Sequence, residues 1–250
     1  MKQIVQSAKT GKLSVRDVPV PTAAAGELLV QTRASLISAG TERMVVQFAR
    51  KSLAAKAKDR PDLVQKVFAK VRTDGLKATV NTVLSRLDEP LPLGYSAAGV
   101  VVEVGADLEG VYRTGDRVAL AGAGAANHAE LNAVPKNLTA PIPHDVSDED
   151  ACYGTLAAIA LHAVRNLDAK LGETAAVLGL GLVGQLAAQF LALSGVRVVA
   201  LDYDQDRLDL AKKLGAEKVI NLADADAAGQ AMDLTSALGC DGILIAAAAE

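Results

Sequence analysis

The chain has 250 residues, of which 50% are hydrophobic and 22% are charged, and its formal net charge at pH 7 is −3. This composition supports a full hydrophobic core in one large or two ordinary domains, and it gives no sign of a nucleic-acid partner. We find no apolar stretch of about 20 residues that would cross a membrane and no signal peptide. Two distant cysteines, Cys152 and Cys240, lack metal-ligand spacing, so we expect a cytoplasmic protein with reduced thiols.

Residues 1–43 show the alternating hydrophobic pattern of β-strands, and residues 44–88 change to helical spacing. The second stretch is also basic, with ten Lys and Arg against four Asp. We therefore predict a domain at 1–150 that carries a helical insert at 44–88. Three roles for the insert stay open: a solvated helical face, a lid that helps bind an anionic substrate, or a docking surface for another module or a second subunit.

Strand patterns return at 99–105, 116–120 and 129–135, and Ser147-x-x-Asp150 predicts a helix start that continues through Val164. From Thr174 the chain alternates strand and helix. The strands are expected at 174–178, 196–201, 218–221 and 241–245, and the last helix at 224–237. This α/β order predicts a Rossmann domain at 151–250 with a doubly wound parallel sheet. Because such sheets usually have six strands, we expect this one to be truncated and the protein to continue.

The most specific motif is Gly179-x-Gly181-x-x-Gly184, between the first of these strands and a helix. Gly179 permits a tight turn, Gly181 lets a pyrophosphate approach the backbone, and Gly184 lets the helix pack on the strand. The N–H groups at the helix start, including those of Leu182 and Val183, favour an anionic phosphate. The motif predicts dinucleotide binding.

An acid, Asp202, ends the second strand of this unit, 18 residues after Gly184. Such an acid accepts hydrogen bonds from the adenosine ribose hydroxyls and repels a 2′-phosphate. Asp204 adds negative charge, and Arg207 offsets part of it. We therefore predict a cofactor site that includes Asp202 and Arg207 and prefers NAD to NADP.

Four segments, Ala34–Glu42, Gly94–Val101, Gly115–Val118 and Leu178–Gly184, make the whole chain resemble the medium-chain dehydrogenase/reductase superfamily. The resemblance implies a GroES-like β-rich domain before the Rossmann domain. The segments Ser38–Arg43, Leu93–Ser96 and Ala121–Glu130 are similar to a bi-domain subgroup. In that subgroup a C-terminal module of the glucose-fructose oxidoreductase type follows, so the resemblance implies a missing C-terminal module.

The chain departs from the zinc-dependent members of this superfamily. Where they carry ligands, it has Ala39, Tyr95, Ser96 and Thr155, so we expect no zinc. Within the resemblance, Tyr95 takes the place of a zinc-binding His, and Thr41 matches a proton-relay hydroxyl. We predict both as catalytic hydrogen-bond donors.

A structural interpretation of the same residues stays open. Tyr95 would then fill the space left by zinc, and Thr41 would bond the backbone of a turn. Glu42 with Arg43 is expected to form a structural ion pair. His128, in a glycine-rich turn, is expected to be structural.

Two functions are consistent with these residues. The first is a zinc-independent NAD(P)-dependent oxidoreductase that moves hydride to or from a carbonyl, alcohol or enone, with sugars and nucleotide sugars among the candidate substrates. The second is a catalytically silent NAD-binding scaffold or sensor for a fused C-terminal oxidoreductase domain. Both functions are compatible with a homodimer.

Overall fold

The computed structural model describes residues 1–8, 10–51, 90–223 and 226–247, together with the isolated residues 55, 58, 65, 73 and 75. The chain forms two compact units, Met1–Gly154 and Thr155–Glu250. Apart from the isolated positions, the part of the predicted helical insert that follows residue 51 lies outside the described residues.

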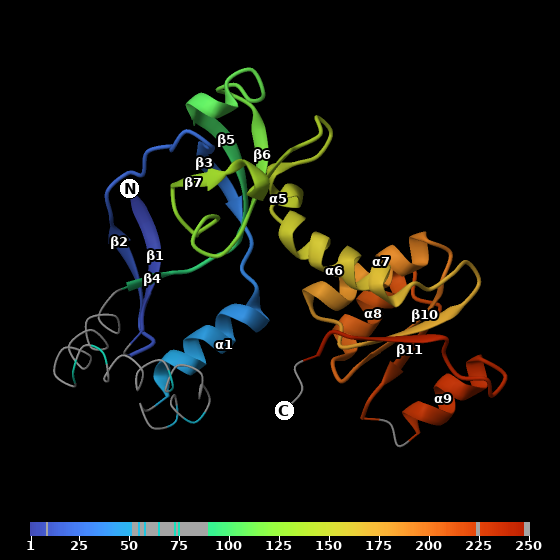
Figure 1. Ribbon diagram of the computed structural model, residues 1–250. Coiled ribbons are helices and arrows are strands. Elements are labelled where there is room, and N and C mark those ends of the chain that lie inside the picture. The colour runs from blue at the N-terminus through green and yellow to red at the C-terminus, as the bar shows by residue number, and fades with distance from the viewer. Residues whose placement is uncertain are drawn as a thin grey trace. The chain divides into compact units, whose positions relative to one another are not determined.

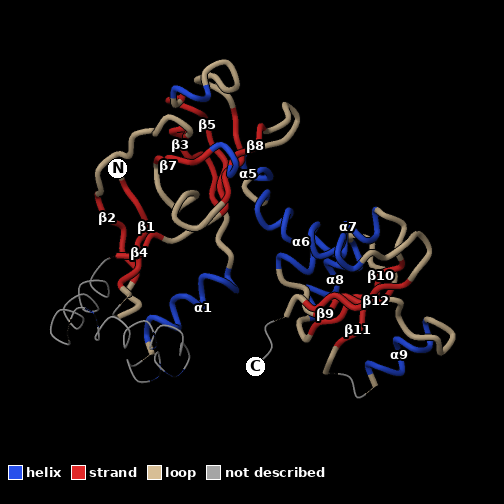
Figure 2. The backbone as a smooth tube through the Cα atoms, viewed as in Figure 1, coloured by secondary structure: helices blue, strands red, loops and turns tan. Residues whose placement is uncertain are grey.

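Two antiparallel sheets make up the described part of the first unit (Figure 2). One has the order β7-β3-β5-β6-β8 and the other the order β2-β1-β4. Inward side chains at alternate positions, such as Leu28 and Val30 on β3 and Val118 and Leu120 on β6, are at most 2% exposed and form the core. The strands are β1 (Lys2–Ser7), β2 (Leu13–Asp17), β3 (Glu27–Ser35), β4 (Pro90–Pro92), β5 (Ser96–Val104), β6 (Arg117–Ala121), β7 (Leu131–Pro135) and β8 (Thr139–Pro141).

Helix α1 (Ala39–Arg50) follows β3 after three residues. It includes Thr41 and Glu42 in its first turn, whereas Ser38 precedes it and is buried. The helix therefore begins earlier than the predicted insert, because residues 39–43 are helical and not part of the β-rich stretch.

The prediction of one helix from Ser147 through Val164 is wrong in one respect, because the structure has two helices there. Ser147 caps α5 (Asp148–Ala151) as expected, and its hydroxyl accepts from the Asp150 N–H at 3.0 Å. The helix is interrupted at Cys152 and Tyr153, and α6 then runs from Gly154 to Leu167. The buried Ser96 hydroxyl donates to the Cys152 carbonyl at 2.6 Å, so a side chain from β5 binds an oxygen that a continuous helix would use internally.

The second unit, coloured yellow to red in Figure 1, is built on a four-stranded parallel sheet of order β11-β10-β9-β12, whose strands are labelled in Figure 2. Strand order 3-2-1-4 is that of a Rossmann sheet. The strands are β9 (Thr174–Leu178), β10 (Arg197–Asp202), β11 (Lys218–Asn221) and β12 (Gly242–Ile245), and the helices between them are α7 (Leu182–Leu193), α8 (Gln205–Lys213) and α9 (Ala227–Leu234).

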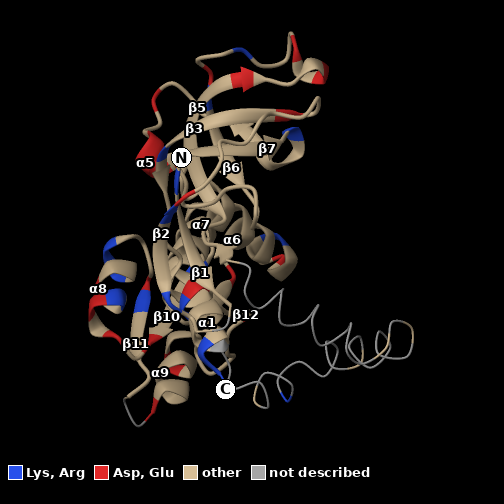
Figure 3. Cartoon of the chain, turned by 90° about the vertical axis from the view of Figure 1, so that its left-hand side faces the viewer, with Lys and Arg blue, Asp and Glu red and all other residues tan. Residues whose placement is uncertain are grey.

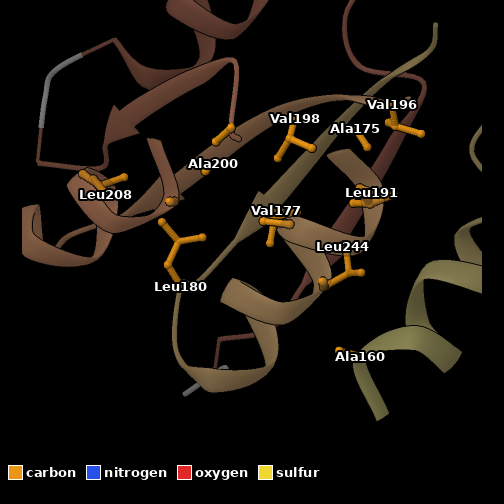
Figure 4. Packing of buried hydrophobic residues seen from close by; sticks show 14 residues of the cluster. Ala160, Ala175, Val177, Leu180, Leu191, Val196, Val198, Ala200, Leu208 and Leu244 are labelled. Carbon is orange, nitrogen blue, oxygen red and sulfur yellow. The ribbon is translucent and has the colours of Figure 1, made fainter. Parts of the chain in front are cut away.

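Apolar residues cover both faces of this sheet. On one face, Val177 and Val198 pack with residues of α6, α7 and α8, including Leu191 and Leu208 (Figure 4). On the other face, Val199 packs with residues of α9. Neighbouring residues of one strand thus belong to opposite cores, which is why β10 reads as a continuous apolar run.

The predicted fold class, a β-rich region followed by a parallel α/β sheet, is confirmed. All four predicted strands of the second unit are present, and α9 is shorter than the predicted helix at 224–237. Within the described ranges, no helix combines the length and the apolar character needed to cross a membrane.

Candidate functional site: a dinucleotide turn and a hydroxyl pair

The turn between β9 and α7 depends on two glycines for reasons internal to the chain. Gly179 has a φ of +90°, and a Cβ on it would lie 2.7 Å from the Ala247 backbone nitrogen. A Cβ on Gly184 would overlap the carbonyl oxygen of Gly179. Positive φ and close backbone approach both favour glycine, so these two residues fix the path of the turn.

Gly181 differs from both neighbours in the motif. Its φ of −69° suits any residue, and a Cβ added to it would meet no heavy atom of the described chain within 4 Å. The fold itself therefore gives no reason for glycine here. Open space at the start of α7 is what a pyrophosphate needs in order to reach the backbone.

The start of α7 supplies the donors for such a group. The first turn-closing bond runs from the Gln185 N–H to the Gly181 carbonyl at 2.9 Å. The amides of Leu182, Val183 and Gly184 come before it, in the part of a helix where N–H groups have no intrahelical acceptor. Together with the helix dipole, they suit a phosphate.

Leu180 fastens this turn to the sheet in two ways. Its side chain is 1% exposed and lies in the same cluster as Val177 and Leu208 (Figure 4). Its N–H donates to Asp202 Oδ2 at 2.6 Å. Because the Leu180 amide is bound to Asp202 at the end of β10, the amides available to a phosphate are those of Leu182, Val183 and Gly184.

Asp202 is a buried carboxylate, 8% exposed, at the place where the sequence predicts a ribose acceptor. Its Oδ1 accepts from the Asp204 N–H at 3.0 Å. Burial acts to raise its pKa, but the N–H groups of Leu180 and Asp204 and the charge of Arg207 outweigh burial and hold the pKa below its usual value. Each carboxylate oxygen has two lone pairs, so both can still accept from ribose hydroxyls.

Arg207 lies between the two acids of this corner. Its Nη1 is 3.7 Å from Asp202 Oδ2, and its Nε is 3.6 Å from Asp204 Oδ2. Asp204 also caps α8 by accepting from the Arg207 N–H. Figure 3 colours the charged residues along α8. Asp206 lies in the first turn of α8 and Lys212 and Lys213 lie in the last, as a helix dipole favours.

One polar residue of this site was missed by the sequence analysis. Gln185 on α7 is 9% exposed, and its amide donates to the Arg207 carbonyl at 2.7 Å. It thereby connects the helix after the phosphate turn with the helix after Asp202. Its place in the first turn of α7 was the available signal.

The first unit brings together the two hydroxyls predicted as catalytic. Thr41 Oγ1 lies 3.4 Å from the Tyr95 hydroxyl, although 54 residues separate them. Ser38 Oγ donates to Thr41 Oγ1, also at 3.4 Å. Both distances are long for hydroxyl pairs.

The expected ion pair of Glu42 with Arg43 is wrong. Among the described residues, Glu42 instead binds His128, with both carboxylate oxygens 3.2 Å from His128 Nε2. Adjacent residues on a helix do not face each other, so Glu42 turns inward. His128 Nδ1 lies 2.9 Å from Ser35 Oγ, and its buried position agrees with the structural role expected for it.

The positions where zinc-dependent relatives carry ligands hold other groups. Ala39 begins α1, Ser96 donates to a backbone carbonyl, and Thr155 lies in α6. In the described ranges of the chain, no three His, Cys, Asp or Glu residues gather as a metal site would require.

The chain is similar to known dehydrogenases and reductases. A family of zinc-binding dehydrogenases matches residues 183–250. An L-threonine 3-dehydrogenase of Rhizobium etli is 27% identical over 90% of this chain and 64% of its own length. A probable D-xylulose reductase A of Arthroderma otae is 32% identical over 61% of this chain and 51% of its own length.

Among solved structures, a mycobacterial protein in complex with NADPH superposes with a TM-score of 0.72. It is 25% identical, and the alignment covers 97% of this chain and 66% of that protein. The chain thus spans between about half and two thirds of the length of these three relatives.

Proposed function

Because its relatives support membership of the medium-chain dehydrogenase/reductase superfamily, we propose that the protein is a zinc-independent NAD(P)-dependent oxidoreductase. The single observation that carries this proposal is Gly181. Glycine is required there only if something outside the described chain approaches the backbone. A pyrophosphate at a helix N-terminus is such a group.

The residues of the second unit fit a dinucleotide. The amides of Leu182, Val183 and Gly184 would hold the pyrophosphate, and Asp202 would accept from the adenosine ribose. NAD is proposed over NADP because Asp202 is a charged carboxylate with a lowered pKa, and it would repel a 2′-phosphate. Arg207 is directed at Asp202 and Asp204, so part of its charge is already neutralised.

When bound, the nicotinamide supplies or accepts hydride. The chain's own contribution is a hydrogen bond to the substrate oxygen, on which negative charge develops as hydride arrives at the carbonyl carbon. The Tyr95 hydroxyl is proposed as the donor, and Thr41 Oγ1 holds that hydroxyl from the other side. In the oxidation direction the same hydrogen bond would stabilise the alkoxide from which hydride leaves.

The substrate class proposed is a small carbonyl, alcohol or enone, including sugars and nucleotide sugars. Cofactor binding is tested first, by titrating the complete protein with NADH and NADPH and following nicotinamide fluorescence. Turnover is then screened by absorbance on panels of sugars, nucleotide sugars, polyols and enones. Tighter binding of NADH and dinucleotide-dependent turnover support the proposal. Binding without any turnover would instead favour a scaffold or sensor, and absence of binding would overturn both.

A further inference from the structure

A buried carboxylate–imidazole pair lies beside the two hydroxyls. The side chain of Glu42 is 13% exposed and that of His128 is 6% exposed. As a carboxylate, Glu42 only accepts hydrogen bonds, so the proton must be on His128 Nε2. Glu42 Oε1 also accepts from the Ser38 N–H at 3.1 Å. The pair therefore holds the residue that precedes α1 as well as the first turn of that helix.

His128 also holds the segment that carries the other hydroxyl. Its backbone N–H donates to the Leu93 carbonyl at 2.8 Å. Gly94 lies between Leu93 and Tyr95 and has a φ of +96°. A Cβ on it would lie only 2.6 Å from the His128 backbone nitrogen. Glycine at 94 is what lets the His128 segment lie against the chain just before Tyr95.

His128 thus contacts both segments that carry the two hydroxyls: α1, and the chain just before Tyr95. The backbone of His128 fixes the approach to Tyr95, and its side chain fixes α1, and with it Thr41, through Glu42. Together these contacts set the position of Thr41 Oγ1 relative to the Tyr95 hydroxyl.

We propose that Glu42 and His128 are positioning residues for the Thr41–Tyr95 pair. The catalytic meaning of this role rests on the proposed function, whereas the geometric role does not. The two residues act on the hydroxyl pair through the geometry of the segments that carry it.

Paired variants separate this role from general stability. In His128→Asn the side-chain amide occupies the place of Nδ1, so contact with Ser35 can persist and contact with Glu42 is lost. In His128→Gln the longer side chain can reach Glu42. Similarly, Glu42→Ala removes the acceptor, whereas Glu42→Gln retains one carbonyl oxygen that can accept from both Ser38 and His128.

The readout is the ¹⁹F NMR spectrum of the complete protein labelled with 3-fluorotyrosine. The resonance of Tyr95 is identified by its absence in Tyr95→Phe. The 250-residue chain has three other tyrosines, and their resonances report whether the fold is retained. Asp148→Asn serves as the control, since it weakens a part-buried contact with Arg117 in the same unit.

We expect His128→Asn and Glu42→Ala to move the Tyr95 resonance by more than its linewidth and to leave the others in place. His128→Gln and Glu42→Gln should restore much of the original position, and Asp148→Asn should not move it. An unmoved Tyr95 resonance in both disruptive variants would overturn the proposal. If either disruptive variant fails to fold, the other is compared with its conservative partner, and equal Tyr95 shifts in those two would also overturn it.

NADH titration of the same variants distinguishes failure of this inference from failure of the proposed function. Absence of NADH binding in the unaltered protein would reject the proposed function and leave the resonance result standing. Once a substrate is known, His128→Asn should lower kcat by on the order of tenfold to a hundredfold, with NADH affinity and KM nearly unchanged.

Discussion

The backbone N–H of Leu180 donates to Oδ2 of Asp202 at 2.6 Å. One contact thus links the phosphate turn after β9 with the acid at the end of β10. A carboxylate that would contact the ribose also holds the loop that would contact the pyrophosphate. Substitution of Asp202 should therefore affect folding as well as cofactor choice.

Asp202→Asn should lower the stability of the second unit by about 1–3 kcal/mol, because either the buried amide of Leu180 or the part-buried amide of Asp204 loses its acceptor. Its effect should depend on pH. Since the folded pKa of Asp202 is lowered, its stabilising contribution is complete above the unfolded value of about 3.9 and is lost as the pH falls through the folded pKa. The stability difference between the two proteins should therefore narrow below about pH 4.

Thermal unfolding followed by circular dichroism between pH 3 and pH 7 measures this difference. Glu217→Gln is a suitable control. Arg197 lowers the pKa of Glu217, but this pair is exposed at the surface, and exposed pairs contribute little. A constant difference between Asp202→Asn and the unaltered protein across the pH range would contradict the linkage.

Gly181→Ala should weaken cofactor binding without a loss of stability, whereas Gly184→Ala should lower the stability of the fold. The first adds a methyl group into open space, so the melting temperature should be retained while NADH affinity falls at least tenfold, equivalent to about 1.4 kcal/mol. The second places a methyl group against the Gly179 carbonyl and should destabilise the protein by about 1–3 kcal/mol. If Gly181→Ala binds NADH as tightly as the unaltered protein, the pyrophosphate does not approach at this residue.

Tyr95→Phe should lower turnover by on the order of 10²–10³ once a substrate is identified, because it removes a donor to the developing oxyanion. Thr41→Val should have a smaller effect in the same direction. NADH affinity should stay nearly constant in both variants, since the predicted dinucleotide contacts belong to the second unit. Full activity in both would show that these hydroxyls only fill space in the first unit.

Purified, untagged protein should contain far less than one zinc ion per chain. The reason is that Ala39, Tyr95, Ser96 and Thr155 stand where the family resemblance implies zinc ligands. Elemental analysis measures the zinc content, and incubation with EDTA should change neither melting temperature nor turnover. Stoichiometric zinc, or loss of activity on chelation, would show that ligands come from elsewhere in the protein.

The parallel sheet and the dinucleotide turn could be predicted from sequence because both depend on local chain properties. Apolar runs of strand length, helical spacing between them and Gly179-x-Gly181-x-x-Gly184 each act within a few residues. The Asp204 cap of α8 is equally local, since the Asp204 side chain accepts from the N–H of Arg207, three residues later. Backbone conformation and hydrophobic periodicity fix such features before any distant contact forms.

Contacts between distant residues were decided only by the tertiary structure. Glu42 pairs with His128, 86 residues away, and not with adjacent Arg43, because successive residues on a helix project in different directions. The Ser96 hydroxyl donates to the carbonyl of Cys152, 56 residues later, at the point where α5 ends. Thr41 and Tyr95 were each singled out by resemblance, but their 3.4 Å approach depends on how β3, α1 and β5 pack. Local sequence patterns thus specified the strands of the second unit and its dinucleotide turn. The packing of distant segments selected which side chains meet, since burial leaves a polar group only the partners that the fold brings within reach.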